Sequence, residues 1–208
     1  MQIVKTTYFT NCYLVYDENT KEGFVVDCVS EKLLLQAAQS RGVKIKAILI
    51  THGHYDHIMG VKAMKDATGA KIYMHESDIE KIDDGAKNFS PYGENKVAHF
   101  DVDVPVKDGD VLEIAGMRAE VVHTPGHSAG SVSYVVGDNI FCGDLLFKDS
   151  YGRFDNYDGD FKTLKKSAER LFALKGEYRL LCGHEEDTTL ACERKHNPVL
   201  TDNYENLF

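Results

Sequence analysis

The chain is 208 residues long and contains 24 lysines and arginines against 33 aspartates and glutamates, a formal net charge of -9. Its 43% hydrophobic and 27% charged residues are typical of a globular protein and exclude an intrinsically disordered chain. The acidic balance argues against a nucleic-acid binder or a protein of anionic membrane surfaces, because both need a basic face. We therefore expect one domain, residues 1–208, with a substantial hydrophobic core.

The first quarter of the chain reads as strands followed by an amphipathic helix. Residues 3–9, 12–16 and 23–27 form short apolar runs separated by polar turns, which predicts antiparallel strands. A helix is expected over 31–41, where the apolar residues recur with helical period and a glycine follows. The near-continuous apolar run 45–50 then predicts a strand that is buried on both faces.

The remaining chain continues to alternate between the two element types. Helices are expected over 59–67, 77–83, 161–175 and 188–195, and strands over 71–74, 111–114, 118–122, 131–136, 139–142 and 178–182. Residues 84–108 have little periodicity and contain two prolines, so we predict a long loop over the body of the protein. Loops of that length commonly have a functional role.

One order of elements occurs twice. A hairpin, an aspartate, a helix, a buried strand and a histidine follow one another around Asp27 and His52, and again around Asp144 and His184. The two offsets are similar but unequal, as in divergent halves with insertions, while chance similarity of two such units is the alternative. The simplest architecture is a two-half α/β sandwich in which these aspartate and histidine ends meet.

Several apolar strands end in a side chain that can bind a metal. The richest segment is HGHYDH at 52–57, which places three imidazoles and one carboxylate within six residues. Such a pattern is expected by chance on the order of once in a thousand chains, against the alternative of a solvated histidine-rich loop. Together with His127, Asp144 and His184 the segment supplies seven candidate ligands, too many for a single tetrahedral zinc.

We therefore predict two divalent ions, with zinc favoured and iron or manganese as alternatives because oxygen ligands widen the choice. Asp144, alone at its strand end, is the natural bridge. Two ions about 3.5 to 4 Å apart can share a hydroxide nucleophile and polarise the group that it attacks.

The expected cellular location and partners of the protein rest on sequence signals that it lacks. No apolar run approaches the roughly 18 residues of a membrane span, and the first residues lack the order of a secretory signal. Five cysteines without a CxxC motif predict buried reduced thiols and not a disulfide framework or zinc ribbon. We expect a cytoplasmic protein with a small-molecule substrate and no membrane partner. The oligomeric state stays open.

The sequence resembles the metallo-β-lactamase-fold hydrolases, and within them the short bacterial glyoxalase II-like (hydroxyacylglutathione hydrolase-like) group. The matching segments span nearly the whole chain: TNCYLV at 10–15, VVD at 25–27, THGHYDHIMG at 51–60, HTPGHSAGS at 123–131, GDLLF at 143–147, YGR at 151–153, GHEEDTT at 183–189 and ERKHNP at 193–198. The resemblance implies a mixed α/β (α+β) fold, a four-layer αββα sandwich of two divergent halves.

The resemblance also implies a role for each candidate ligand. The first metal is held by His52, His54 and His127, the second by Asp56, His57 and His184, and Asp144 bridges them. Asp56 and Asp144 are then the catalytic carboxylates, because Asp56 also orients the bridging hydroxide. Aspartate at 144, where β-lactamases of this fold commonly place cysteine, favours the glyoxalase II type.

Two departures concern the substrate. Glyoxalase II enzymes continue into a helical domain that helps bind glutathione, whereas this sequence ends at Phe208. Glu185 and Glu186 replace the usual Gly-Pro, and carboxylates beside the metals would disfavour an anionic substrate. We predict that Arg153 and Tyr151 contact the substrate. A structural pair of the arginine with a neighbouring aspartate is the alternative.

The leading hypothesis is a dinuclear hydrolase that cleaves a thioester or a related ester. A lactonase or other ester hydrolase is a close alternative, because this scaffold supports many chemistries. A different reaction class is a mononuclear iron persulfide dioxygenase, which shares the fold and holds its metal with two histidines and one aspartate. A third reading is a non-catalytic metal-binding module.

Overall fold

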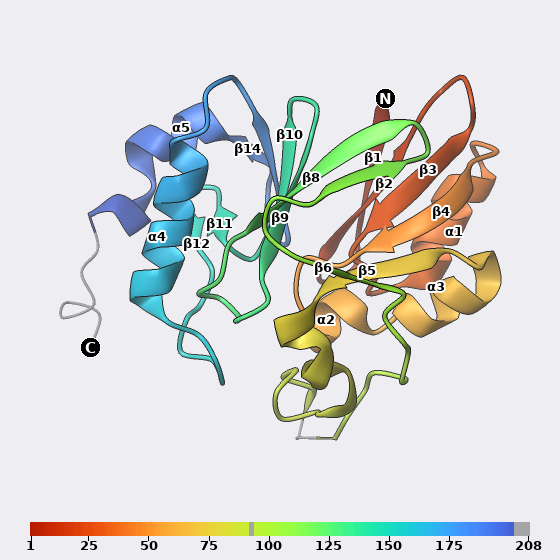
Figure 1. Cartoon of the computed structure of the whole chain (residues 1–208), viewed down its shortest axis with the longest axis horizontal. Helices are drawn as coiled ribbons and strands as arrows, with labels where there is room; N and C mark the ends of the chain where they lie inside the picture. Colours follow the sequence, from red (N-terminus) through yellow and green to blue (C-terminus); the bar gives the residue numbers. More distant parts are fainter. Residues whose placement is uncertain (92–93, 202–208) are drawn as a thin grey trace.

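Two six-stranded β-sheets lie face to face in the centre of the molecule (Figure 1). The computed structural model describes residues 1–91 and 94–201. In the first sheet, neighbouring strands follow the chain order; they pair antiparallel as far as β3 and parallel from β3 onward. Its strands are β1 (Gln2–Thr7), β2 (Asn11–Tyr16), β3 (Glu22–Val26), β4 (Lys44–Leu49), β5 (Lys71–His75) and β6 (Val104–Val106).

The second sheet has the order β14-β13-β10-β9-β8-β7. Its pair β10 and β13 is parallel and the other pairs are antiparallel. The strands are β7 (Val111–Ile114), β8 (Met117–His123), β9 (Val132–Val136), β10 (Asn139–Gly143), β13 (Arg179–Cys182) and β14 (Thr188–Thr189). A separate hairpin follows β10 and consists of β11 (Leu146–Phe147) and β12 (Ser150–Tyr151).

Helices cover the outer faces of both sheets. On one side lie α1 (Glu31–Gln39) and α3 (Val61–Thr68), and on the other α4 (Phe161–Phe172) and α5 (Leu190–His196) (Figure 1). The molecule therefore has the layers α, β, β and α. The predicted four-layer sandwich is confirmed.

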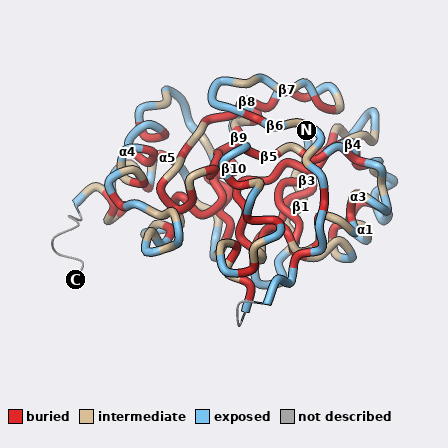
Figure 2. The backbone as a smooth tube through the Cα atoms, turned by 60° about the horizontal axis from the view of Figure 1, so that its bottom comes forward, coloured by how far each residue is buried: buried red, intermediate tan, exposed pale blue. Residues whose placement is uncertain are grey.

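Three apolar cores lie between these layers. Ile48 belongs to the core under α1 and α3, Leu49 and Tyr134 to the core between the sheets, and Leu164 to the core under α4. Ile48 and Leu49 are adjacent in β4 yet belong to different cores, because successive side chains of a strand point to opposite faces. A strand buried on both faces needs a near-continuous apolar run such as that at 45–50. Figure 2 shows the buried backbone passing through the centre of the molecule.

The two halves have a matching layout that positions the site. In the first half, α1 connects the parallel strands β3 and β4, which are followed by Asp27 and His52. In the second half, α4 lies between the parallel strands β10 and β13, which are followed by Asp144 and His184. Parallel strands end at the same edge of a sheet, so these four residues lie at one end of the sandwich, as the repeated order predicts.

Some elements differ from the expectation. The predicted loop 52–57 runs into a short helix, α2 (Tyr55–Ile58), and residues 76–83 form a 3-10 helix, η1 (Glu76–Asp83), where an α-helix was expected. The long loop 84–108 includes β6, which contains Pro105. A proline is tolerated there because β6 is an edge strand and needs no hydrogen bond on its outer side. A 3-10 helix, η3 (Pro198–Leu200), follows α5.

Two further expectations concern the burial of the cysteines and the absence of a membrane-spanning segment. Four of the five cysteines are buried and all five are free, but Cys192 is exposed, so the prediction of buried thiols is wrong for that residue. Within residues 1–91 and 94–201, no helix is both long and apolar enough to cross a membrane.

Candidate metal centre

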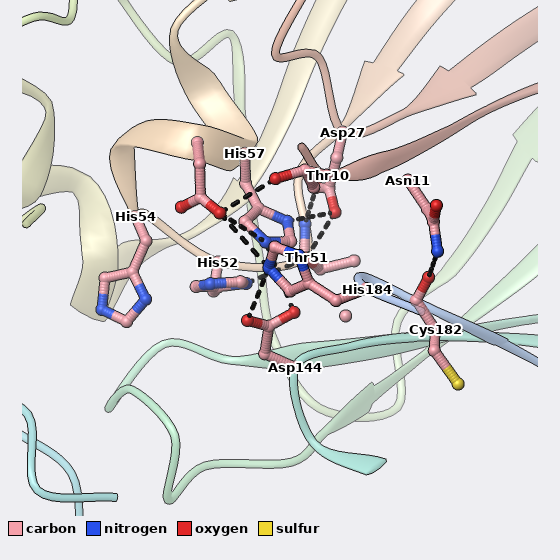
Figure 3. A network of polar contacts seen from close by, with 12 residues as sticks. Thr10, Asn11, Asp27, Thr51, His52, His54, His57, Asp144, Cys182 and His184 are labelled. Atoms are coloured by element: carbon pink, nitrogen blue, oxygen red, sulfur yellow. Dashed lines mark hydrogen bonds and ion pairs between the residues drawn. The ribbon is translucent and has the colours of Figure 1, made fainter. Parts of the chain in front are cut away.

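The seven candidate ligands meet at one end of the two sheets. Figure 3 shows His52, His54, His57, Asp144 and His184 among them. They follow strands β4, β8, β10 and β13, or lie in the loop and helix α2 after β4. These residues are His52, His54, Asp56, His57, His127, Asp144 and His184. Side chains that are up to 132 positions apart in the sequence are thus brought within ligand distance by the meeting of the two halves.

The first cluster consists of His52, His54 and His127. The Nε2 atom of His127 lies 2.8 Å from Nδ1 of His54 and 3.2 Å from Nε2 of His52. Burial, followed by the neighbouring imidazoles, lowers the pKa of His52 well below its usual value and the pKa of His54 to about 3. Burial also lowers the pKa of His127. The three rings are therefore neutral at pH 7, the form in which imidazole binds a metal.

The second cluster consists of Asp56, His57 and His184. Oδ2 of Asp56 lies 3.3 Å from Nε2 of His184 and 3.8 Å from Nε2 of His57. Asp144 adjoins both clusters, because its Oδ2 is 3.6 Å from Nε2 of His127 and 3.3 Å from Nε2 of His184. Its other oxygen, Oδ1, is 3.3 Å from Nε2 of His57. Asp144 therefore lies between the two clusters.

Carboxylates give the second cluster the opposite electrostatics. Burial alone would lower the pKa of His57, but Asp144, Asp27 and Asp56 outweigh burial and raise it well above its usual value. Burial is likewise outweighed at His184, where hydrogen bonds to Asp144 and Asp56 raise the pKa to about 10. Burial would raise the pKa of Asp56, yet His57 and its other partners lower it to about 2. This cluster stabilises positive charge.

Asp27, which follows β3, lies beside His57 and restrains its ring by a hydrogen bond (Figure 3). Its Oδ2 accepts hydrogen bonds from Nδ1 of His57 at 2.8 Å and from the Thr51 hydroxyl at 2.7 Å. Its Oδ1 accepts the backbone N–H of Thr51 at 2.8 Å. These contacts direct Nε2 of His57 toward the cluster. The VVD motif marks Asp27 in the sequence, but its role becomes visible only once His57 lies beside it.

Backbone carbonyls orient two further rings. The carbonyl of Arg153 accepts a hydrogen bond from Nδ1 of His127 at 2.7 Å, and the carbonyl of Phe9 accepts one from Nδ1 of His184 at 2.9 Å. A proton on Nδ1 directs Nε2 toward the cluster as the ligand atom.

Asp78 of η1 joins the two loops that carry the first cluster. Its Oδ2 accepts the N–H of Gly53 and the hydroxyl of Ser128, both at 2.7 Å. Its Oδ1 accepts the N–H of Gly130 at 2.7 Å and the ammonium of Lys81 at 2.8 Å. Burial would raise the pKa of the fully buried Asp78, but Lys81 and the other donors lower it. Asp78 stands outside every motif, so sequence reasoning missed it.

A cavity of about 780 Å³ opens beside the two clusters. Of the adjacent glutamates that the sequence places near the metals, Glu185 lines the cavity, whereas Glu186 pairs with Lys148 at 2.6 Å and is not part of the described lining. The described lining is Phe9, His54, Tyr55, Asp56, Phe89, His127, Asp144, Phe147, Arg153, Asn156, His184 and Glu185.

The two predicted substrate contacts have different surroundings. Arg153 lines the cavity, but its guanidinium forms a two-point ion pair with Asp155 at 2.9 and 3.0 Å, which is the structural alternative. Tyr151 packs in β12 against the rings of Phe154 and Phe161. The structure therefore brings Arg153 to the cavity, whereas Tyr151 is not among the described lining residues.

The donor set fits divalent ions. Nε2 of His57 and Oδ1 of Asp144 are buried and have no hydrogen-bond partner among the described residues, although buried polar atoms are almost always paired. They face one another at 3.3 Å. Imidazole nitrogens mixed with carboxylate oxygens suit Zn, Fe and Mn.

Comparison with known proteins identifies the family. Residues 6–184 match the family model described as the metallo-beta-lactamase superfamily. The chain belongs to this superfamily, as its motifs predict. The hydroxyacylglutathione hydrolase GloC of Haemophilus influenzae is 29% identical over 213 residues, which cover 96% of this chain and 97% of that protein.

A second relative is longer. The hydroxyacylglutathione hydrolase of Rhodopseudomonas palustris (strain HaA2) is 31% identical over 176 residues, which cover 83% of this chain and 61% of that protein. GloC is also named a hydroxyacylglutathione hydrolase, and this chain covers almost all of its length. The expectation that such enzymes continue into a further domain is therefore too general.

Solved structures with the same fold have varied names. The BLEG-1 B3 metallo-beta-lactamase has a TM-score of 0.90 at 31% identity, covering 97% of this chain and 99% of that one. ETHE1 from Myxococcus xanthus has a TM-score of 0.82 at 28% identity, covering 99% and 87%. TTHA1623 in a di-iron-bound form has a TM-score of 0.80 at 34% identity, covering 95% and 99%. The fold alone therefore does not select a substrate.

Proposed function

We propose that this protein is a dinuclear metal-dependent hydrolase that cleaves a small-molecule thioester or a related ester. The observation that carries the proposal is the place of Asp144, whose two oxygens adjoin two complete clusters of donors. One ion would be held by His52, His54 and His127, the second by Asp56, His57 and His184, with Asp144 as the bridge.

Zinc is the proposed metal, with iron or manganese as alternatives. Two such ions would supply a hydroxide nucleophile at neutral pH and polarise the carbonyl under attack. The residues of the chain provide the orientation. The Thr10 hydroxyl donates to Oδ2 of Asp56 at 2.9 Å and restrains this carboxylate, to which we assign the orientation of the nucleophile. Asp27 restrains His57 in the same way.

The test combines metal analysis with a substrate panel. We expect two zinc ions per chain after loading, and hydrolysis of at least one thioester that stops when a chelator removes the metal. The panel contains S-lactoylglutathione, thioesters of uncharged thiols, lactones and phosphodiesters. If the metal-loaded protein leaves the whole panel untouched, the proposal is wrong. Faster turnover of lactones than of thioesters would select the lactonase alternative.

A second candidate is the mononuclear iron dioxygenase. One group of donors, His52, His57 and Asp144, has the two histidines and one aspartate that this alternative needs. The complete cluster of Asp56, His57 and His184 favours the dinuclear hydrolase. One iron per chain with oxygen uptake on glutathione persulfide would support the dioxygenase, whereas two zinc ions without oxygen uptake would exclude it.

A further inference from the structure

Four aromatic side chains of the described lining contribute apolar surface to the cavity wall. They come from four separate segments of the chain: Phe9, Tyr55, Phe89 and Phe147. The rings of Phe9 and Tyr55 are 6.3 Å apart, and Phe147 stands 5.9 Å from the ring of His184. Phe89 meets His54 edge to face at 5.0 Å. Apolar surface therefore borders the centre on several sides.

Phe89 is held in an uncommon backbone conformation. Its φ of 61° lies in the left-handed region, which a bulky aromatic residue rarely adopts. Its neighbours are fixed: the carbonyl of Asn88 accepts the N–H of Tyr55 at 2.8 Å, and Oδ1 of Asn88 accepts the N–H of Ser90 at 2.9 Å. The amide of Asn88 also donates to the carbonyl of Lys81 at 2.8 Å. Strain maintained in this way is typical of ligand-contacting residues.

Arg153, the cation of the described lining, is paired with a carboxylate. Its Nε and Nη2 atoms, one edge of the guanidinium, donate to the two oxygens of Asp155, and its charged centre lies 5.6 Å from the ring of Phe89. A substrate carboxylate would compete with Asp155 for this guanidinium, whose charge the pair already offsets.

The neighbouring lysines are paired as well. Lys148, next to Phe147, pairs with Glu186 at 2.6 Å, and Lys5 pairs with Asp187 at 2.9 Å. Glu185 adds a carboxylate to the cavity lining. Among the described residues at this rim, the charges are therefore balanced or acidic, and an anionic tail of a substrate would meet Glu185 without a free ammonium or guanidinium.

We propose that the cavity selects substrates with an aromatic or bulky apolar acyl group and an uncharged leaving group, and that Phe89 sets the acyl preference. This inference rests on the proposed hydrolase function. An apolar group gains by leaving water and by edge or face contact with the aromatic wall. Glutathione, which carries two carboxylates and one ammonium and is a net anion at neutral pH, offers no such apolar group and meets the carboxylate of Glu185 at the rim.

The experiment uses four matched thioesters on the zinc-loaded protein. Phenylacetyl and acetyl groups are each joined to N-acetylcysteamine, which is uncharged, and to glutathione. We expect kcat/KM to favour phenylacetyl over acetyl, and N-acetylcysteamine over glutathione, each by about tenfold or more. Phe89→Ala should reduce the phenylacetyl preference about tenfold, mainly through KM, and Phe89→Tyr should retain it. Tyr157→Ala, which removes an exposed aromatic outside the described lining, is the control.

Binding provides a readout that needs no turnover. Calorimetry with the stable thioether S-benzyl-N-acetylcysteamine should show binding that Phe89→Ala weakens about tenfold, and weaker binding of S-benzylglutathione. Glu185→Gln should improve the binding of S-benzylglutathione about threefold. If none of the four thioesters is hydrolysed, the calorimetry still tests the cavity, while the full substrate panel decides separately whether the hydrolase proposal fails. The inference itself is overturned if glutathione derivatives are preferred, or if Phe89→Ala leaves the phenylacetyl preference and the thioether affinity unchanged.

Discussion

The two donor clusters differ in composition and in protonation: the first has three histidines, and the second has two histidines and an aspartate. In the cluster of His52, His54 and His127, burial and neighbouring imidazoles lower every pKa. In the second cluster, carboxylates overcome burial and raise the pKa of His57 and that of His184. The protonation of a buried histidine is thus decided by which side chains the other strands bring beside it, and not by burial alone.

The clusters also differ in access. The side chains of His52, His54, His127 and His57 are buried, whereas the side chain of His184 is 29% exposed. Both clusters border the cavity, the first through His54 and His127 and the second through Asp56 and His184. Asp144 adjoins both clusters, so a change at this residue should affect both.

The largest effect is expected for Asp144→Asn. This change removes the carboxylate that adjoins both clusters, so metal content should fall below two ions per chain and kcat/KM should fall about a thousandfold or more. Elemental analysis measures the metal content, and thioester kinetics measure kcat/KM. Asp66→Asn, in an exposed pair with Lys62, is the matched control and should change neither. Two retained ions with activity within tenfold of the parent would contradict a bridging role.

The next effect is a change confined to the second cluster. His184→Ala should leave one ion per chain, held by the buried histidine cluster, and reduce kcat/KM about a hundredfold. His196→Ala, in exposed α5, is the control with the same change of residue type. A complete loss of metal from His184→Ala would show that the first cluster does not hold its ion without the second.

Asp78→Asn tests the support of the first cluster. Loss of this buried ion pair with Lys81 should lower the free energy of unfolding by about 3 kcal/mol. The folded-state pKa of Asp78 is lowered, so its contribution is present above the pKa of the unfolded carboxyl and is lost as pH falls through the folded value. Urea unfolding of the metal-free protein should therefore show a shallower acid limb in Asp78→Asn.

A positioning role predicts more than lost stability. Asp78 binds Gly53 and Ser128, which flank the histidines of the first cluster. Asp78→Asn should therefore weaken the affinity for the more tightly bound of the two metal ions about tenfold, in protein that is still folded. Competition with a chromophoric chelator measures this affinity. If the variant is destabilised but its metal affinity is unchanged, the role of Asp78 is structural only.

The smallest effect is expected for Thr10→Val. The variant loses one hydrogen bond to Asp56, worth about 1 kcal/mol, so kcat should fall roughly fivefold while two ions are retained. Thr201→Val, on the exposed surface, should have no effect. A loss of metal from Thr10→Val would mean that the hydroxyl supports ligation and not orientation.

Much of this protein follows from local sequence. Strands and helices with strong apolar period were predicted close to their observed bounds, and the dense segment at 52–57 marks the site without further information. The exceptions have local causes. Helix α2 is too short to show a period, and β6 is a three-residue edge strand with a proline.

The sequence by itself predicted a two-half α/β sandwich from its repeated order of elements. Its motifs, through the family that they resemble, predicted the four-layer architecture, the superfamily and the seven candidate donors. Only the tertiary structure decided what surrounds those donors. Asp27 behind His57, Asp78 between two loops and Phe89 in the cavity wall act through residues distant in the chain. Their chemistry depends on contacts and burial that appear only when the two halves are packed together, and no spacing in the sequence specifies these.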